Sequence, residues 1–183
     1  MSTAEDEFDW RSERNEDAIV YFMRQYGEEI KRLVYTFVKN WEQAEDITQD
    51  VFVTLYTKLD TFRGDSAVRS WIYTIAINRS KDYLRSWHHR KISFTDKWMP
   101  LTSASSTTIE EDVIQNSDNK MLADSVLELP LKYREVVILY YYKQFSLKEI
   151  SSIIGVNEGT LKTRLIRGRN KLQEIYEKKG GRE

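Results

Sequence analysis

The sequence predicts an all-α fold of two small helical domains joined by a flexible linker. Of its 183 residues only 7 are glycine and 2 are proline, while 40% are hydrophobic. This composition favours packed helices over low-complexity or collagen-like chains. Several segments repeat apolar residues at steps of three and four, which is the spacing of one helix face. We expect domains at residues 1–95 and 118–183, with the linker at 96–117.

The linker is predicted from composition, and composition also excludes several kinds of site. Residues 101–108 carry six hydroxyl groups, and an acidic triplet follows at 110–112, so this segment has little to bury. Cysteine is absent, which excludes disulfides and thiolate zinc sites. No apolar run approaches about 18 residues and the first residues are acidic. We therefore expect a cytoplasmic protein with no membrane insertion and no secretory signal.

Charge is distributed unevenly along the chain. The net charge is only −1, yet residues 1–30 carry −6, 61–100 carry +5, 101–130 carry −5 and 131–183 carry +6. Two basic blocks separated by an acidic stretch indicate two surfaces that face a polyanion. Ordinary solvated helix faces are the alternative interpretation of the same pattern.

A further candidate surface, separate from the two basic blocks, lies on an amphipathic helix predicted over residues 41–59. Its apolar face consists of Ala44, Ile47, Val51 and Leu55. Its opposite face is mostly acidic and polar, with one valine, and carries Glu42, Asp46, Gln49, Asp50, Val53 and Thr57. From the residues alone, plain solvent surface is the simpler interpretation of that face.

A polar loop follows this helix at residues 60–66. It contains Phe62, Arg63, Gly64, Asp65 and Ser66. An aromatic ring beside an arginine is one way to stack single-stranded bases. The alternative is that the phenylalanine folds back onto the core, as loop phenylalanines usually do.

The next helix is predicted from about residue 68 to about residue 88. A polar stripe along it consists of Thr74, Asn78, Lys81 and Arg85. Such side chains suit a nucleic-acid backbone and base edges. Arg79 falls on the apolar side and would need a partner if it is buried, whereas Trp71 and Tyr73 are expected to add aromatic surface. The adjacent His88 and His89 point about 100° apart on a helix, so we expect no metal site, and no cofactor is expected either.

The C-terminal domain is predicted to begin with a helix from Pro130 to about Lys143. A proline suits the first turn of a helix because it has no backbone N–H to leave unsatisfied. Residues 136–142 are β-branched and aromatic, so a strand is the local alternative. The length of the segment and its flanking charges favour the helix.

Two further helices follow in the pattern of a helix-turn-helix. Ser146 and Glu149 match a capping box, Gly155 suits the end of the short helix that they begin, and Asn157 can cap the next one. A short helix, a tight turn and a longer basic helix together predict a DNA-binding unit.

The longer basic helix is predicted to carry the reading surface. Its inner face consists of Leu161, Leu165, Gly168 and Leu172. Its outer face holds Thr163, Ile166 and Arg167, flanked by Lys162, Arg164, Arg169 and Lys171. An outward Ile166 suits a thymine methyl, Arg167 suits guanine, and the flanking bases suit phosphates.

Several of these segments together resemble a known family. In the first domain they are AEDITQDVF at 44–52, LDTFRGDS at 59–66, WIYTIAIN at 71–78 and DYL at 82–84. In the second they are LP at 129–130, FSLKEI at 145–150, EGTLKTRL at 158–165 and RGR at 167–169. Their order and spacing resemble regions two and four of bacterial sigma factors. The short connection between them resembles the extracytoplasmic-function (ECF) group of the sigma-70 family.

The resemblance implies a role for each surface. Asp46, Gln49, Asp50 and Val53 would bind the clamp helices of the RNA polymerase β′ subunit. Residues 62–68 would hold a base flipped from the minus-ten element, and Asn78, Lys81 and Arg85 would follow that strand. The minus-thirty-five element would be bound by Lys148, Thr160, Lys162, Thr163, Arg164, Ile166 and Arg167.

The resemblance also implies partners and excludes an enzyme. The partners are RNA polymerase core, including its β subunit, promoter DNA, and an anti-sigma factor that is either soluble or membrane-bound. The alternative is a stand-alone helix-turn-helix regulator, which accounts for residues 131–183 but not for the acidic face or the Phe62 loop. A metal-dependent hydrolase is a third possibility, but the sequence shows no spacing typical of metal ligands and no nucleophile–base pair that would support it.

Overall fold

The computed structural model describes residues 15–62, 67–93 and 117–181, with the side chains of 88–93 and 117–118 left out of the description. The chain forms two compact units, Met1–Trp98 and Met99–Glu183, and each is described by itself. Within the described residues every regular element is helical, which confirms the all-α, two-domain prediction. No helix in these segments is long and apolar enough to cross a membrane.

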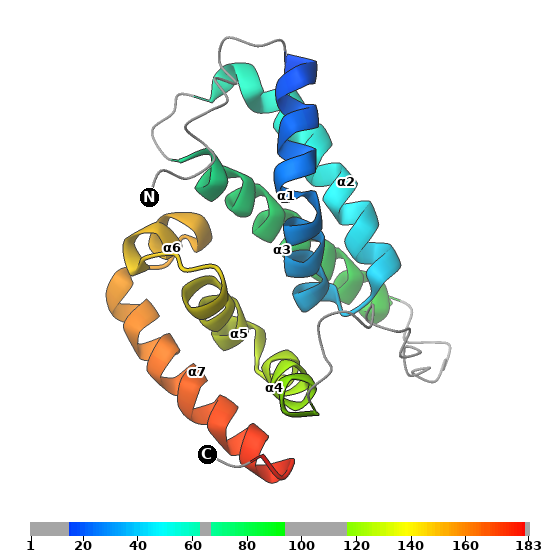
Figure 1. The fold of residues 1–183 in the computed structure, drawn as a ribbon. Coiled ribbons are helices and arrows are strands. Elements are labelled where there is room, and N and C mark those ends of the chain that lie inside the picture. Colours follow the sequence, from blue (N-terminus) through cyan, green and yellow to red (C-terminus); the bar gives the residue numbers. More distant parts are fainter. Residues whose placement is uncertain (1–14, 63–66, 94–116, 182–183) are drawn as a thin grey trace. The chain divides into compact units, whose positions relative to one another are not determined.

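The first unit is built on three long helices, coloured blue to green in Figure 1. They are α1 (Asn15–Val38), α2 (Trp41–Lys58) and α3 (Val68–Ser93), and a single 3₁₀ turn, η2 (Leu59–Thr61), follows α2. Each of the three helices packs against the other two. Their contact is apolar, and its fully buried members include Ile30, Val34, Val51, Leu55, Ile72 and Ile77.

Local chemistry sets the tight connection between α1 and α2. Lys39 adopts a left-handed backbone conformation with φ 55°, which turns the chain sharply. The Asn40 side chain then accepts a hydrogen bond from the Gln43 N–H at 2.9 Å, satisfying a free donor of the first turn of α2. Beside this turn the rings of Tyr35 and Trp41 stack with centroids 4.0 Å apart.

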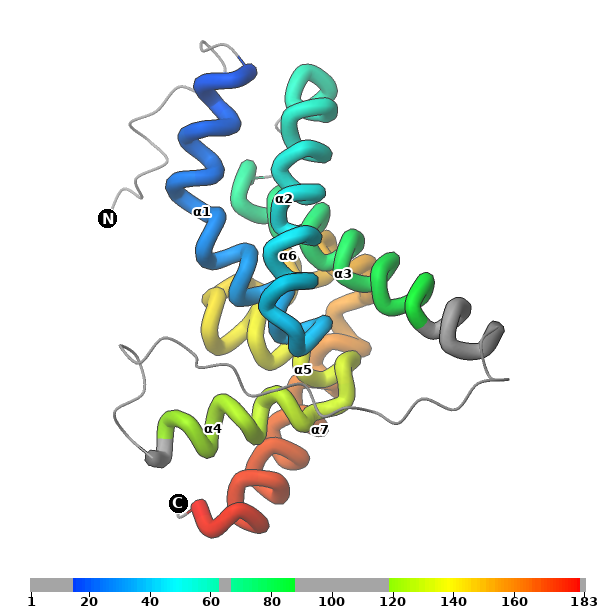
Figure 2. Tube along the Cα trace, turned by 90° about the vertical axis from the view of Figure 1, so that its right-hand side faces the viewer, coloured from blue at the N-terminus to red at the C-terminus, as the bar shows by residue number. Residues whose placement is uncertain are grey.

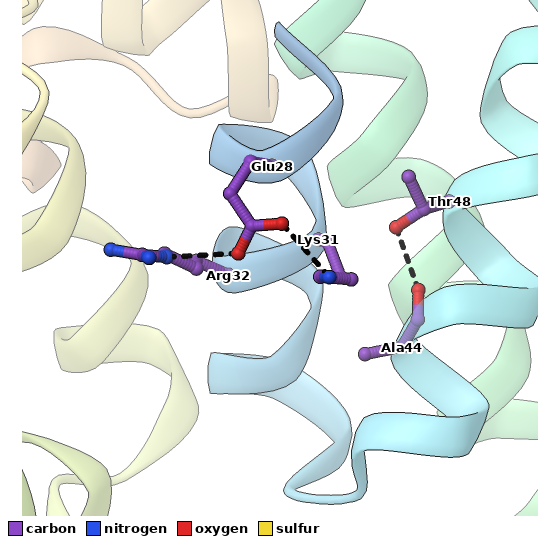
Figure 3. Close-up of polar contacts among 5 residues, drawn as sticks. All are labelled: Glu28, Lys31, Arg32, Ala44 and Thr48. Atoms are coloured by element: carbon purple, nitrogen blue, oxygen red, sulfur yellow. Dashed lines mark hydrogen bonds and ion pairs between the residues drawn. The ribbon is translucent and has the colours of Figure 1, made fainter. Parts of the chain in front are cut away.

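Polar contacts within single helices complete this unit (Figure 3). On α1, Glu28 pairs with Lys31 at 2.8 Å and with Arg32 at 3.1 Å, and the hydrogen bond from Lys31 holds the pKa of Glu28 below its usual value. On α2, the buried Thr48 hydroxyl donates to the Ala44 carbonyl at 2.6 Å. Because its hydroxyl is satisfied in this way, threonine is tolerated on the buried face of α2.

The second unit contains the remaining helices, which Figure 2 shows from green to red. They are α4 (Ser117–Glu128), α5 (Leu131–Val137), the π-helical turn η3 (Ile138–Tyr142), α6 (Leu147–Ile154) and α7 (Glu158–Lys178). Helix α7 packs along α4, α5 and α6.

The β-branched and aromatic segment at residues 136–142 is helical, as predicted, because it forms the end of α5 and the turn η3. Its first half is buried, while Tyr140, Tyr141 and Tyr142 are exposed.

The ends of α6 match the predicted helix-turn-helix closely. The Ser146 hydroxyl accepts from the Glu149 N–H, and the Glu149 carboxylate accepts from the Ser146 N–H, which completes the capping box. Gly155 ends α6 in the left-handed conformation with φ 70°, where a side chain would be strained. Asn157 caps α7 by accepting from the Thr160 N–H at 2.8 Å.

Candidate nucleic-acid interface

The polar face of α2 is held outward by the burial of its opposite face. Ala44, Val51 and Leu55 are fully buried and Ile47 is nearly so. The predicted contact residues Asp46, Gln49, Asp50 and Val53 are all exposed. Val53 has 62% of its surface exposed and lies on the same face as the exposed Asp46, Gln49 and Asp50. The face therefore combines negative charge with one apolar contact point.

The loop after η2 is described only at its first residue. Phe62 is half-buried, and its ring stacks on that of Trp71 with centroids 4.4 Å apart and an interplanar angle of 20°. It therefore packs against a partner on α3 while remaining partly accessible, and this partner is a half-buried surface residue rather than the core that the fold-back alternative named. Arg63, Gly64, Asp65 and Ser66 lie outside the described residues.

The predicted polar stripe is on one side of α3. Asn78 and Arg85 are exposed, and Lys81 and Thr74 are half-buried. Arg85 forms an ion pair with Asp82 one turn earlier. Because both partners of that pair are well exposed, solvent screens it and it is readily exchanged for a phosphate contact. The stripe thus presents an amide and two cations along one helix edge.

The prediction that Arg79 lies on the apolar side of α3 was wrong, because its side chain is exposed, but it does have a hydrogen-bond partner on α2. Its Nε and Nη2 groups donate to the Thr54 hydroxyl oxygen at 3.2 and 2.8 Å. Thr54 in turn donates to the carbonyl of Asp50 at 2.7 Å. The side chain of Arg79 nevertheless remains exposed, so the guanidinium lies at the rim between α2 and α3 rather than in the core. Sequence analysis did not identify Thr54, because the contact depends on how α2 and α3 pack.

Tyr73 is not part of the aromatic surface, and that prediction was wrong. Its side chain is 0% exposed and its hydroxyl donates to the Glu29 carboxylate on α1. Burial and the Glu29 carboxylate raise the pKa of Tyr73 far above its usual value. The guanidinium of Arg69 lies 5.5 Å from the centre of the Tyr73 ring and contacts Glu29 at 3.4 Å. The cluster ties α1 to the start of α3.

The second surface is the outer face of α7. Its exposed residues are Thr160, Lys162, Thr163, Ile166 and Arg167. Ile166 is 57% exposed, as predicted for a side chain that points away from the core. On the opposite side Leu161 and Gly168 are buried, while Leu165 and Leu172 are only half-buried. Lys148, on α6, is exposed as well.

Arg164 differs from its neighbours because it is tied to the interior. Its Nη1 group lies 3.3 Å from the carboxylate of Glu135 on α5, which is only 4% exposed. An ion pair with a buried carboxylate is costly to break, so the guanidinium is held in place against α5. Arg134, which precedes Glu135 on α5, donates to the Leu129 carbonyl at 2.8 Å. Burial lowers the pKa of Arg134.

Within the segments that the structure describes, no group of three or more histidine, aspartate and glutamate side chains is placed to hold a metal ion. The exposed side chains of both surfaces supply hydrogen bonds, charge and apolar contact, which is the chemistry of nucleic-acid and protein recognition.

Family comparisons cover both units. Residues 22–90 match the family model of sigma-70 region 2, and residues 120–172 match that of sigma-70 region 4. The first match contains the exposed α2 face and the α3 stripe, and the second contains α6 and most of α7.

Curated relatives align over nearly the whole chain. The ECF RNA polymerase sigma factor SigW of Bacillus subtilis is 30% identical over 167 residues, covering 87% of this chain and 89% of its own. The ECF RNA polymerase sigma-E factor of Escherichia coli strain K12 is 31% identical over 163 residues, covering 82% and 84%.

Solved structures share the fold. The sigma factor RpoE of Bartonella quintana, in complex with the anti-sigma factor NepR, matches with a TM-score of 0.72 at 23% identity, over 85% of this chain and 94% of that one. CnrH, in complex with the cytosolic domain of CnrY, matches with a TM-score of 0.64 at 19% identity, over 92% of both chains. With two region models and full-length relatives in agreement, the chain belongs to the ECF RNA polymerase sigma factors of the sigma-70 family.

Proposed function

We propose that this chain binds core RNA polymerase, directs it to specific promoters and helps to melt the minus-ten element. The observation that carries the proposal is the presence of two separate surfaces in one chain, an acidic face beside a basic stripe in residues 15–93 and a helix-turn-helix in residues 117–181. A stand-alone helix-turn-helix regulator would need only the second. The comparisons match both regions and do not favour that alternative.

In this proposal the exposed face of α2 binds the β′ clamp helices of polymerase. Asp46 and Asp50 supply charge complementary to a basic partner, Gln49 supplies hydrogen bonds, and Val53 is the apolar contact. The predicted domain limits, 1–95 and 118–183, then separate the polymerase-binding and melting functions from minus-thirty-five recognition.

Melting would be a binding reaction rather than a catalysed one. Holding an extruded base of the non-template strand offsets the few kcal/mol that unstacking costs. The α3 stripe, with Asn78, Lys81 and Arg85, would follow that strand. No nucleotide hydrolysis is required, and the named relatives are transcription factors rather than enzymes, so we propose that this chain is not an enzyme.

Helix α7 would lie in the major groove of the minus-thirty-five element. Ile166 and Arg167 would contact base edges, with Thr160, Lys162 and Thr163 beside them and Lys148 near phosphate. One guanidinium nitrogen of Arg164 is paired with Glu135, so only its other N–H groups would contact phosphate. Because one nitrogen is fixed by a buried carboxylate, the remaining donors are already oriented before DNA binds.

An anti-sigma factor, soluble or membrane-bound, is a further proposed partner. The structurally similar sigma factor RpoE was solved with the anti-sigma factor NepR, and the structurally similar CnrH was solved with the cytosolic domain of CnrY. It would cover the α2 face, the α7 face or both, and the complex would be cytoplasmic. Affinity capture of the tagged chain from unstressed native cells should recover such a protein beside polymerase, and recovery of polymerase alone would contradict this part of the proposal.

The experiment that tests polymerase binding uses matched charge reversals on α2. Asp50→Lys should weaken binding to core polymerase at least tenfold, because it inverts the charge at the centre of the proposed face. Glu45→Lys makes the same change on the same helix, five residues before Asp50 and therefore about 140° around the helix axis from it, and should weaken binding much less. Equal binding by both variants, measured by fluorescence titration with core, would contradict the assignment.

A further inference from the structure

The fourteen residues before α1 carry a negative charge that neither candidate surface uses. They hold five acidic and two basic side chains, and four of the acidic ones fall within residues 5–9. Residues 1–14 lie outside the described part of the structure. The start of α1 and the pattern of charge around it therefore indicate where this acidic run can bind.

Helix α1 begins close to the segment that leads into α3. The Asn15 side chain donates to the Asp60 carboxylate at 2.7 Å, which ties the start of α1 to the turn η2 at the end of α2 (Figure 1). Phe62 directly follows η2, and its ring lies 4.4 Å from that of Trp71 in the first turn of α3, measured between centroids. A short series of contacts therefore connects the point where residues 1–14 join the fold to the beginning of α3.

The charges around this point favour α3 as the contact for the acidic run. Exposed carboxylates lie at the start of α1 and on η2, namely those of Glu16, Asp17 and Asp60, and they repel a further acidic segment. Along α3 the stripe offers the cations Lys81 and Arg85. Arg85 pairs with Asp82, but its side chain is 73% exposed, so another carboxylate can replace that partner at little cost.

The acidic run is long enough to reach these cations. Lys81 lies ten residues after Trp71, which is about 15 Å along the axis of α3. Glu7 lies eight residues before Asn15, and an extended chain of that length spans about 26 Å. Because the run is tethered to the same unit, its effective concentration at the stripe is on the order of millimolar.

We propose that residues 5–9 dock on the α3 stripe of their own chain and compete there with single-stranded DNA. The inference rests on the proposed function, in which the stripe follows a DNA strand. Carboxylates of the run take the place of phosphates at Lys81 and Arg85, so the free chain binds nucleic acid weakly. A promoter strand, with one negative charge on each nucleotide, displaces the run once polymerase holds the strand against the stripe.

The test is binding of single-stranded DNA by the full chain. The probe is a fluorescein-labelled 12-mer of random sequence, followed by fluorescence anisotropy. The triple variant Glu5→Gln, Asp6→Asn, Glu7→Gln should bind the probe about 3- to 100-fold more tightly than wild type, the range for loss of three exposed ion pairs. The gain should shrink at high salt, which screens exposed charges. Equal affinity of the triple variant and wild type, or no binding by the triple variant, would overturn the proposal.

A matched control exists between the two units. Residues 110–112 contain two glutamates and one aspartate, as residues 5–7 do, so Glu110→Gln, Glu111→Gln, Asp112→Asn changes the net charge by the same amount. This second triple variant should bind the 12-mer with nearly wild-type affinity. Equal gains in the two triple variants would show that net charge alone controls binding and would overturn the proposal.

A second measurement reports the contact itself. A carbodiimide couples a carboxylate to an adjacent lysine amine, and mass spectrometry of the digested wild-type chain identifies the joined peptides. A crosslink between residues 5–9 and Lys81 that an excess of the 12-mer suppresses supports docking. Lys58, in the last turn of α2, is the control, because it lies close to η2 whether or not the run docks. Absence of the Lys81 crosslink, with or without one to Lys58, contradicts the proposal.

The two levels of the account fail in different ways. Failure of docking leaves core binding and promoter-dependent transcription by the wild-type chain intact. Failure of the proposed function removes both.

Discussion

At the scale of single residues, α7 presents two side chains of opposite chemistry next to each other. Ile166 is more than half exposed and Arg167 is exposed beside it. An exposed isoleucine side chain is unfavourable in water, and contact with a thymine methyl group would remove that apolar surface from water. An arginine can bind guanine through two hydrogen bonds. We therefore propose that these two residues are the most direct determinants of sequence preference in this domain.

The first prediction concerns Arg167. Arg167→Ala should weaken binding of holoenzyme to promoter duplex by about 1–3 kcal/mol and relax preference at one base pair, as for a base-reading arginine. Lys171→Ala, which removes a cation from a flanking position on the same helix, should weaken binding to all sequences alike. Competition binding with single-base promoter variants measures both effects. An unchanged preference in the Arg167 variant would show that another residue reads the base.

The second prediction concerns Asn78. Asn78→Ala should leave core binding intact and slow open-complex formation, because its amide is exposed on the α3 stripe and the α2 face is untouched. Permanganate reactivity of unpaired thymines measures the opening rate. Ser86→Ala, a neutral change at an exposed position later on α3, is the control. Normal melting by the Asn78 variant would mean that the strand follows a different surface.

At the scale of the element, close approach of α7 to α5 depends on Gly168. A Cβ built at this residue would lie 3.0 Å from the Val137 side chain and 3.3 Å from Cβ of Tyr133. Val137 is 1% exposed, so it has little room to move. A side chain at this position would therefore require Val137 or Tyr133 to shift by a few tenths of an ångström.

The third prediction follows from this contact. Gly168→Ala gains about 1 kcal/mol in helix propensity but overpacks a buried contact, which costs about 1–3 kcal/mol. We expect a net loss of about 1 kcal/mol in the free energy of unfolding. Gly159→Ala, whose Cβ would meet only Asn157 at 3.5 Å, should be neutral or stabilising. Urea denaturation compares the two, and a more stable Gly168 variant would show that α5 and α7 can separate.

The fourth prediction concerns the beginning of α6. Ser146→Ala removes the side-chain half of the capping box and should cost about 1 kcal/mol of stability. Ser146→Asp keeps an acceptor for the Glu149 N–H and should lose less. Both effects are measured by thermal unfolding. Equal losses in the two variants would mean that the cap contributes little to the domain.

Helix α2 and the ends of α6 could be predicted because each depends on neighbouring residues. Apolar spacing identified the buried face of α2, and the local hydrogen bonds of Ser146 and Asn157 mark helix beginnings in any context. The position of Tyr73 could not be predicted in this way. Helix α3 packs on both α1 and α2, so it is buried around much of its circumference and has no single apolar stripe.

The site could be predicted only where no tertiary contact intervenes. The exposed residues of the α2 face and of α7 are where the sequence placed them. The contacts of Arg79 with Thr54 and of Arg164 with Glu135 join residues 25 and 29 positions apart. Such pairs depend on how helices pack, which the local pattern does not contain.

At the scale of the whole molecule, charge is segregated while the net charge is only −1. Basic residues gather in 61–100 and 131–183, and acidic residues dominate 1–30 and 101–130. In a chain with this pattern the basic segments attract DNA, while the low net charge keeps the attraction of the whole molecule to nucleic acid weak.

The fifth prediction is a steep salt dependence that arises from the basic blocks. Affinity of holoenzyme for promoter DNA should fall linearly on a log–log plot, and each neutralised phosphate contributes about 0.9 to the slope. Lys162→Ala should reduce the magnitude of the slope by about one. Glu158→Ala, in the first turn of the same helix, should not reduce it. Identical slopes for wild type and the Lys162 variant would remove this residue from the phosphate contacts.

The central claim is tested most directly by run-off transcription with bacterial core polymerase on a library of genomic fragments, with and without this chain. We expect new, discrete start sites that share two upstream elements, and loss of those transcripts with the Asp50→Lys variant. No new transcripts, together with no binding to core, would contradict it and leave a helix-turn-helix protein that acts on duplex DNA alone.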